Sequence, residues 1–198
     1  MEHSELIILA AGESSRMQRP KALLPFLDKG ISFVECIVNT YLSAGIKKIT
    51  IVTSEKLNYE LNLLFPFGDI KIITNTKPQL ERMYSVYLGI KEVSNDHYVY
   101  IQDCDNPFVP VEIIRELYKH KNEADYIVPM FNAKGGHPIL LSPKIIKYIK
   151  ALNQVVTEDT LKNHLRLFIR KNIPVNTNSI HANINTPELF QQNNLAHT

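Results

Sequence analysis

The sequence predicts an α/β domain built on a mostly parallel β-sheet, and two observations indicate this class. Short apolar runs typical of buried strands alternate with longer stretches in which apolar residues recur at helical spacing. The chain has 198 residues, an ordinary size for one domain with a substantial core, and no internal repeat or linker divides it. We therefore expect residues 1–198 to form a single domain with a polar tail at 191–198.

The first half of the chain contains most of the predicted parallel strands. Apolar runs indicate strands at 6–11, 47–53, 70–74 and 98–102. Helical spacing indicates helices at 31–44, 57–65 and 111–121, and a further helix after Pro78. Gly45 is well suited to end the first helix, because glycine readily adopts the backbone conformation that follows a helix.

The second half continues the alternation. We expect strands at 125–131 and 137–141, joined by a turn in which Gly135 and Gly136 supply the positive φ angles. A helix should begin at Ser142 with Pro143 in its first turn, and residues 158–170 have a helical pattern.

Composition and charge exclude several classes of protein. The net charge is only +2 and the 22 basic residues are scattered, which argues against a nucleic-acid partner. Cys36 and Cys104 are neither spaced for a metal site nor numerous enough for a disulfide framework, so they fit a reducing compartment. The N-terminus lacks the basic region of a signal peptide, and no apolar run approaches membrane-spanning length. We expect a cytoplasmic protein without a membrane partner.

The polar loop after the first strand has the features of a phosphate site. Gly12 has no Cβ, so the backbone can approach a ligand there, and the N–H groups of residues 12–15 can form an anion-binding nest. Arg16 supplies a planar fork and Lys21 a point charge. Neither a dinucleotide fingerprint nor a P-loop matches, because the loop has one glycine and Lys21 is followed by Ala22.

This loop resembles the first signature of the molybdenum cofactor cytidylyltransferase and guanylyltransferase family. The signature reads L-A-[AG]-G-x-S-x-R-M-G-x-x-K-x-L-L, and the chain matches every fixed position except Gln18, where the family usually has glycine. The resemblance implies a Rossmann-like, three-layer nucleotide-diphospho-sugar transferase fold with a mostly parallel mixed sheet. It also implies transfer of a nucleoside monophosphate from a nucleoside triphosphate to a phosphorylated acceptor, with release of pyrophosphate.

The resemblance assigns residues to two roles. Those expected to bind the nucleotide are Leu9, Ala10, Ala11, Gly12, Glu13, Ser14, Ser15, Arg16, Lys21, Ser85 and Asp103. Those expected to act in catalysis are Arg16, Lys21 and Asp105. No Ser-His-Asp or Cys-His arrangement is apparent, and none is needed, because the attacking phosphate is already mostly dianionic at pH 7. The reaction needs charge neutralisation and in-line positioning.

Two later segments resemble further signatures of the family and suggest a metal. Asp103-Cys104-Asp105-Asn106-Pro107 follows a strand, as ligand-binding residues do in open α/β sheets, and Asp105 falls on the metal-binding aspartate of the family. Asp103 points to the opposite face if the strand persists, and it either turns back to the site or caps the turn. Asn185, in Asn183-Ile184-Asn185-Thr186-Pro187-Glu188, sits where the family places a second metal-coordinating oxygen. We expect Mg²⁺ between Asp105, Asn185 and the phosphates.

The base and the acceptor are suggested by fewer residues. Ala11 favours CTP over GTP, since relatives with Ala-Ala-Gly tend to use CTP, and Ser85 resembles the serine of a base-contacting G-x-x-S element whose glycine is replaced by Arg82. His137 lies in a segment like the family's acceptor-side G-H-P-[VI]-L. Asp159 matches the aspartate of an acceptor-side G-D-x-G-[AL]-R, but Asn163 stands near the position of its arginine.

Three alternatives stay open. The altered segment at 158–163 leaves room for a sugar- or alcohol-phosphate nucleotidyltransferase. The Asp103-Cys104-Asp105 sequence also mimics the D-x-D motif of glycosyltransferases that use nucleotide sugars, although the Lys21 loop favours a triphosphate. A non-catalytic nucleotide-binding module is the third.

Overall fold

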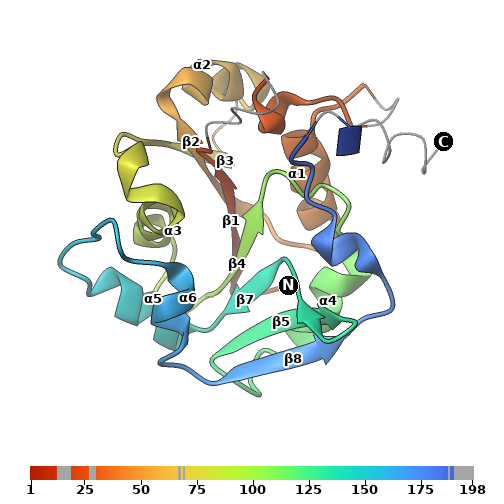
Figure 1. Cartoon of the computed structure of the whole chain (residues 1–198), viewed down its shortest axis with the longest axis vertical. Helices are drawn as coiled ribbons and strands as arrows, with labels where there is room; N and C mark the ends of the chain where they lie inside the picture. Colours follow the sequence, from red (N-terminus) through yellow and green to blue (C-terminus); the bar gives the residue numbers. More distant parts are fainter. Residues whose placement is uncertain (13–18, 27–29, 67, 69, 187, 190–198) are drawn as a thin grey trace.

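The structure, a computed structural model, describes residues 1–12, 19–26, 30–66, 68, 70–186, 188 and 189. These residues form an α/β architecture in which helices cover both faces of one sheet (Figure 1). The strands are β1 (Ser4–Ala10), β2 (Lys48–Ser54), β3 (Ile70–Asn75), β4 (Tyr98–Asp103), β5 (Tyr126–Phe131), β6 (Lys134–Gly135), β7 (Ile139–Leu141) and β8 (Arg170–Pro174). The helices are α1 (Phe33–Ser43), α2 (Glu55–Leu64), α3 (Glu81–Glu92), α4 (Val111–Lys119), α5 (Pro143–Lys150) and α6 (Leu161–Leu165), with short 3₁₀ turns at Lys21–Leu23, Pro78–Leu80 and Asn178–His181.

The sheet is mixed and mostly parallel. Its strand order is β3-β2-β1-β4-β7-β5-β6, with β8 paired to β5. The β1–β2, β1–β4, β2–β3 and β5–β8 pairs are parallel, whereas the pairs made by β7 and β6 are antiparallel. The predicted fold class is therefore confirmed. β1 lies between β2 and β4, so the chain reverses its direction of winding at β1, and ligands bind at such points in open α/β sheets.

Side-chain alternation along β1 divides the core into two layers. Leu6, Ile8 and Ala10 pack into the apolar cluster that includes residues of α1, α2 and α4. Ile7 and Leu9 point the other way, into the cluster that includes residues of α3, α5 and α6. Every residue of β1 is buried, as expected for a parallel strand covered on both faces.

The helix expected at 158–170 is wrong in extent. Only α6 (Leu161–Leu165) is helical, and Arg170 already begins β8, which runs parallel to β5 with Tyr126 opposite Arg170. The apolar pattern misled because Leu167 and Ile169 are about two-thirds exposed and do not belong to a packed helix face. Pairing with a distant strand decided the conformation of this segment.

The turn between β5 and β6 also differs from the expectation. Asn132 and Ala133 take the positive φ angles, +48° and +61°, while Gly135 and Gly136 do not. The two glycines instead permit close approach. A Cβ at Gly136 would lie 2.5 Å from the Ile180 carbonyl oxygen, and one at Gly135 would lie 2.3 Å from the Arg170 guanidinium.

Candidate functional site

A cavity of about 430 Å³ opens at the carboxyl ends of β1, β3 and β4. This volume lies within the range of small-molecule sites. The cavity is lined by Leu9, Ala11, Gly12, Lys21, Asn75, Pro78, Glu81, Arg82, Ser85, Asp103, Cys104 and Asp105. It therefore coincides with the point where the direction of winding reverses.

At one end of the cavity, the Lys21 ammonium group lies between two side-chain oxygen atoms. Lys21 Nζ donates to Asp105 Oδ2 at 3.2 Å and to Asn185 Oδ1 at 2.5 Å. The Ile184 N–H donates to the Asp105 carbonyl at 2.8 Å, and this bond ties the C-terminal segment to the turn after β4. Lys21, which is 84 residues from Asp105 and 164 residues from Asn185 in the sequence, thus brings these predicted residues together.

Burial raises the pKa of Asp105, although the Lys21 ammonium opposes this by favouring the charged form. Asp105 Oδ1 is buried and has no hydrogen-bond partner among the described residues. A buried carboxylate oxygen without a partner is costly, so Asp105 Oδ1 is a candidate atom for contact with a ligand.

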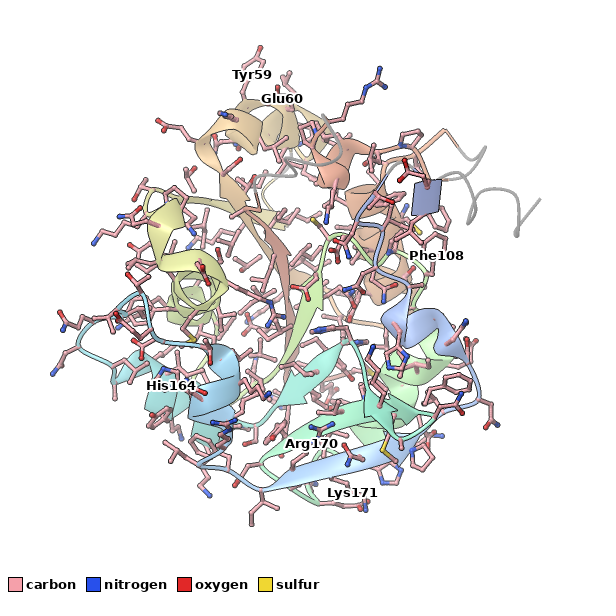
Figure 2. All side chains as sticks on the ribbon, viewed as in Figure 1. Tyr59, Glu60, Phe108, His164, Arg170 and Lys171 are labelled. Atoms are coloured by element: carbon pink, nitrogen blue, oxygen red, sulfur yellow. The ribbon has the colours of Figure 1, made fainter. Side chains whose placement is uncertain are left out.

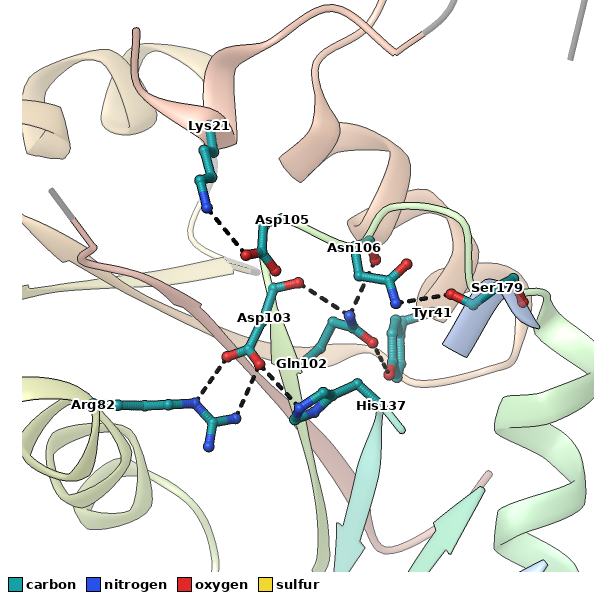
Figure 3. A network of polar contacts seen from close by, with 9 residues as sticks. All are labelled: Lys21, Tyr41, Arg82, Gln102, Asp103, Asp105, Asn106, His137 and Ser179. Atoms are coloured by element: carbon teal, nitrogen blue, oxygen red, sulfur yellow. Dashed lines mark hydrogen bonds and ion pairs between the residues drawn. The ribbon is translucent and has the colours of Figure 1, made fainter. Parts of the chain in front are cut away.

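A buried polar network fixes the turn that carries both aspartates (Figure 3). Gln102 is fully buried, accepts a hydrogen bond from the Tyr41 hydroxyl at 3.3 Å, and donates to the carbonyls of Asp103 and Asn106. Asn106 in turn donates to the Ser179 carbonyl at 2.9 Å. Because these groups are satisfied within the network, the turn has one preferred geometry.

Asp103 lines the cavity. Of the two roles that the sequence left open, facing the site or capping the turn after β4, the structure therefore shows the first. Arg82 Nε donates to Asp103 Oδ1 at 3.0 Å and Arg82 Nη2 to Oδ2 at 3.1 Å. His137 Nε2 lies 3.3 Å from the same Oδ2. Figure 3 shows the Asp103 carboxylate directed toward Arg82 and His137, on the side away from Lys21. The two aspartates therefore serve different parts of the site.

His137 is mostly enclosed, and burial lowers its pKa, opposed by the nearby Asp103 carboxylate. Its Nδ1 atom is buried and has no hydrogen-bond partner among the described residues. His137 does not line the cavity itself but stands behind Asp103, next to β7.

The other end of the cavity is formed by the carboxyl end of β3 and the first turns of α3. Asn75 Nδ2 donates to Ser85 Oγ at 2.9 Å, and Asn75 Oδ1 accepts from the Lys77 N–H at 2.8 Å. Ala11 and Gly12 lie on the lining as well, and a Cβ at Gly12 would meet nothing within 4 Å.

Two groups of predicted site residues are not placed in the cavity lining, and Cys104, which is part of the lining, was expected only as a buried residue. Glu13, Ser14, Ser15 and Arg16 lie outside the described residues. Ala10 is buried on the opposite face of β1 and does not line the cavity, because side chains alternate along a strand. Cys104 belongs to the apolar core, as expected of a free cysteine, and burial raises the pKa of its thiol.

Asp159 is also absent from the cavity lining. Its Oδ2 accepts from the Val156 N–H at 2.8 Å, and its Oδ1 lies 3.6 Å from His164 Nε2. His164, on α6, accepts from or donates to the Tyr148 hydroxyl at 3.0 Å, and Figure 2 shows it on the helix at the far side of the sheet from α4. In this structure Asp159 holds the loop before α6 and lies beside His164.

Sequence reasoning did not place Asn75, Pro78, Glu81 and Arg82 on the site. Asn75 ends a parallel strand, which is the signal that had identified Asp103, but the strand was expected to end one residue earlier. The signal for Arg82 was present too, since an arginine replaces the glycine of the base-contacting element.

The described residues include no cluster of three or more His, Cys, Asp or Glu side chains that could hold a metal by themselves. A divalent cation at Asp105 and Asn185 would need further oxygen ligands besides these two residues. Among the helices that the structure describes, none is long and apolar enough to span a membrane.

Comparisons with known proteins identify the family of the chain. Residues 6–173 match the model of the MobA-like NTP transferase domain. The chain is 28% identical over 191 residues to the molybdenum cofactor cytidylyltransferase of Escherichia coli (strain K12), covering 96% of this chain and 95% of that protein. It is 32% identical over 165 residues to a probable molybdenum cofactor guanylyltransferase of Flavobacterium johnsoniae, covering 82% and 79%. A nucleotidyl transferase from Methanothermobacter superposes with a TM-score of 0.78 over both whole chains at 18% identity, a likeness of fold.

Proposed function

This chain belongs to the MobA-like NTP transferase family, and on that basis we propose that it moves a nucleoside monophosphate from a nucleoside triphosphate to a phosphorylated small-molecule acceptor. Pyrophosphate is the second product. The observation that carries the proposal is the Lys21 ammonium held between the Asp105 carboxylate and the Asn185 amide oxygen at the mouth of the sheet. A cation and two oxygens in this place suit a polyphosphate and its counter-ion.

To catalyse this reaction, the protein has to position the two substrates and neutralise the charge of the triphosphate. The attacking group is a phosphate oxygen, and its second pKa of about 6 makes it mostly dianionic at pH 7, so no side chain has to remove a proton. Lys21, together with Arg16 from the preceding loop, holds the triphosphate so that the attacking oxygen meets the α-phosphorus in line with the leaving pyrophosphate.

The same cluster fits a divalent cation. The buried, unpartnered Asp105 Oδ1 and the Asn185 Oδ1 atom are oxygen ligands of the kind that Mg²⁺ prefers. An ammonium already bridges the two residues, so their oxygens are arranged to hold positive charge. We assign Asp105 and Asn185 as the residues that would hold Mg²⁺. When bound there, Mg²⁺ neutralises the triphosphate and the developing charge on the leaving group.

CTP is the proposed donor. Ala11 lines the cavity beside Gly12, and in this proposal its methyl group narrows the pocket against a purine. Ser85 and Asn75, which are hydrogen-bonded to each other, form the polar floor on which the base would lie.

Molybdopterin, a bulky and anionic molecule, is the proposed acceptor, by likeness to the cytidylyltransferase relative. A smaller sugar or alcohol phosphate is the second candidate. One observation favours it. Asn163 stands near the position of an arginine in the family, and its hydrogen bonds among the described residues are with Thr160 and Arg166, close by in the sequence.

Pyrophosphate release tests the proposal. Each of CTP, GTP, UTP and ATP is incubated with Mg²⁺ and with molybdopterin or a panel of sugar and alcohol phosphates. We expect acceptor-dependent release with CTP, a loss of at least about 100-fold in Lys21→Ala, and no loss in Lys56→Ala, an exposed control on α2. Absence of release with every pair, or equal activity in Lys21→Ala and Lys56→Ala, would refute the proposal. If molybdopterin is turned over and none of the sugar or alcohol phosphates is, the hypothesis of a smaller acceptor is excluded.

A further inference from the structure

Arg82 projects from the first turn of α3 into the cavity and is held there by a two-point ion pair. Its Nε and one of its Nη2 hydrogens are used by the two oxygens of Asp103. A guanidinium has a second edge, formed by Nη1 and Nη2, which also presents two parallel N–H donors. The Arg82 side chain lines the cavity and is 41% exposed, while that of Asp103 is 21% exposed, so the guanidinium is accessible to a ligand in the cavity.

The surroundings fix the orientation of this edge. Asp103 lies between Arg82 on one side and His137 on the other, and the network through Gln102 holds its backbone (Figure 3). On the helix side, Glu81 has φ +53° and ψ −152°, a conformation that residues with side chains rarely adopt. Such backbone strain persists only where the surrounding structure imposes it, and it is common at ligand-binding positions. Arg82 is therefore a preorganised donor pair.

The position of Arg82 along the cavity indicates that it contacts the base of the nucleotide. Lys21 and Asp105 occupy the phosphate end, so a bound triphosphate places its base toward α3 and the end of β3. Arg82 and Ser85 are three residues apart on α3 and thus share a helix face, and both line this end. The base would lie against Ser85 within reach of the free edge of Arg82.

We propose that Arg82 reads the base by donating two parallel hydrogen bonds to a pair of adjacent acceptors, with Asp103 as the residue that positions it. Cytosine presents such a pair at O2 and N3, and guanine presents one at O6 and N7. Uracil and adenine do not, because a donor lies next to the acceptor on the corresponding edges. Arg82 therefore selects CTP or GTP against UTP and ATP, while the Ala11 methyl adds the preference for the smaller of the two. This inference rests on the proposed function, because it needs a nucleoside triphosphate in the cavity.

Isothermal titration of the whole chain with the Mg²⁺ complexes of CTP, GTP, UTP and ATP tests it. We expect the wild-type protein to bind CTP about tenfold or more tighter than UTP, as one bidentate contact allows. Arg82→Lys keeps the charge but not the fork, so it should lose most of this ratio while its affinity for UTP stays within a few-fold of wild type. Asp103→Asn should reduce the ratio by a smaller factor. Arg115→Lys, on α4, is the matched control and should change nothing.

Each contrary result has a distinct meaning. Equal binding of CTP and UTP by the wild-type protein, or an undiminished ratio in Arg82→Lys, overturns the role of Arg82 and leaves the proposed function intact. A uniform loss of affinity for all four triphosphates and for pyrophosphate in Arg82→Lys also overturns it, because that result assigns Arg82 to the phosphates. If the folded wild-type protein binds no triphosphate, the proposed function fails and this inference fails with it. Thermal melting of each variant checks the fold.

Discussion

At Gly89, helix α3 packs directly against Ile7 of the sheet, and replacing this glycine with alanine tests the packing of the helix that carries Arg82 and Ser85. A Cβ at Gly89 would lie 2.7 Å from Ile7 Cγ2 and 3.0 Å from Ile7 Cδ1. Favourable contacts between carbon atoms are about 3.5–4.0 Å long, so the new methyl overlaps a side chain that is itself fully buried on β1. Either α3 or Ile7 must move.

Two opposing effects set the magnitude. Alanine is favoured over glycine inside a helix by about 1 kcal/mol, whereas an added methyl in a closely packed core costs about 1–3 kcal/mol. We expect the overlap to dominate, with a net loss of about 1–2 kcal/mol in the free energy of unfolding and a Tm lower by about 2–8 °C. A shift of α3 would also weaken CTP binding.

Urea unfolding of Gly89→Ala, Ile7→Ala and the double variant provides the measurement. Ile7→Ala removes all three atoms that the new Cβ would meet, so the double variant should be less destabilised than the sum of the single variants by about 1 kcal/mol. Additive losses, or a Tm that rises in Gly89→Ala, would show that α3 is not in close contact with the sheet at this position.

Three further predictions concern the lining of the cavity. In urea unfolding, Glu81→Gly should be about 1 kcal/mol more stable than Glu81→Ala, because glycine adopts the positive φ angle of this position without strain. This is the reverse of the usual helix ranking, and a more stable Glu81→Ala variant would disprove the strain. Ala11→Gly should narrow the ratio of CTP to GTP affinity by about 10- to 200-fold in calorimetry, because a single methyl group separates substrates by about 1–3 kcal/mol. A wild-type protein that binds GTP more tightly than CTP contradicts this. His137→Ala should raise the acceptor KM or lower kcat with CTP affinity unchanged, and a loss confined to CTP binding would count against an acceptor-side role.

Much of the fold was predictable because local pattern and tertiary structure agree. The strands of the first half are short, apolar and bounded by turns, and a parallel sheet buries them on both faces, so the pattern has one interpretation. The proximity of Asp105 and Asn185 was predictable for a different reason. Each lies in a segment that resembles a signature of the family, and the structure brings both onto Lys21.

The remaining features depend on distant parts of the chain. β8 exists because residues 170–174 pair with β5, some 40 residues away, and nothing in their local pattern indicates a strand. Arg82 acquires its place from an ion pair with Asp103, and Asp103 in turn faces the cavity because Gln102 and Asn106 hold the turn. Ala10 was assigned to the site by its motif, but the alternation along β1 turns it into the core.

The division of labour between the two aspartates is the central claim, and single-turnover pyrophosphate release over a Mg²⁺ titration tests it most directly. Asp105→Asn should slow release by orders of magnitude and raise the Mg²⁺ concentration needed, because Asp105 is assigned to the metal and the phosphates. Asp103→Asn should keep the wild-type Mg²⁺ dependence and lose less activity, because Asp103 positions Arg82 and His137. Near-normal, Mg²⁺-dependent release in Asp105→Asn, or the larger loss in Asp103→Asn, would contradict the account.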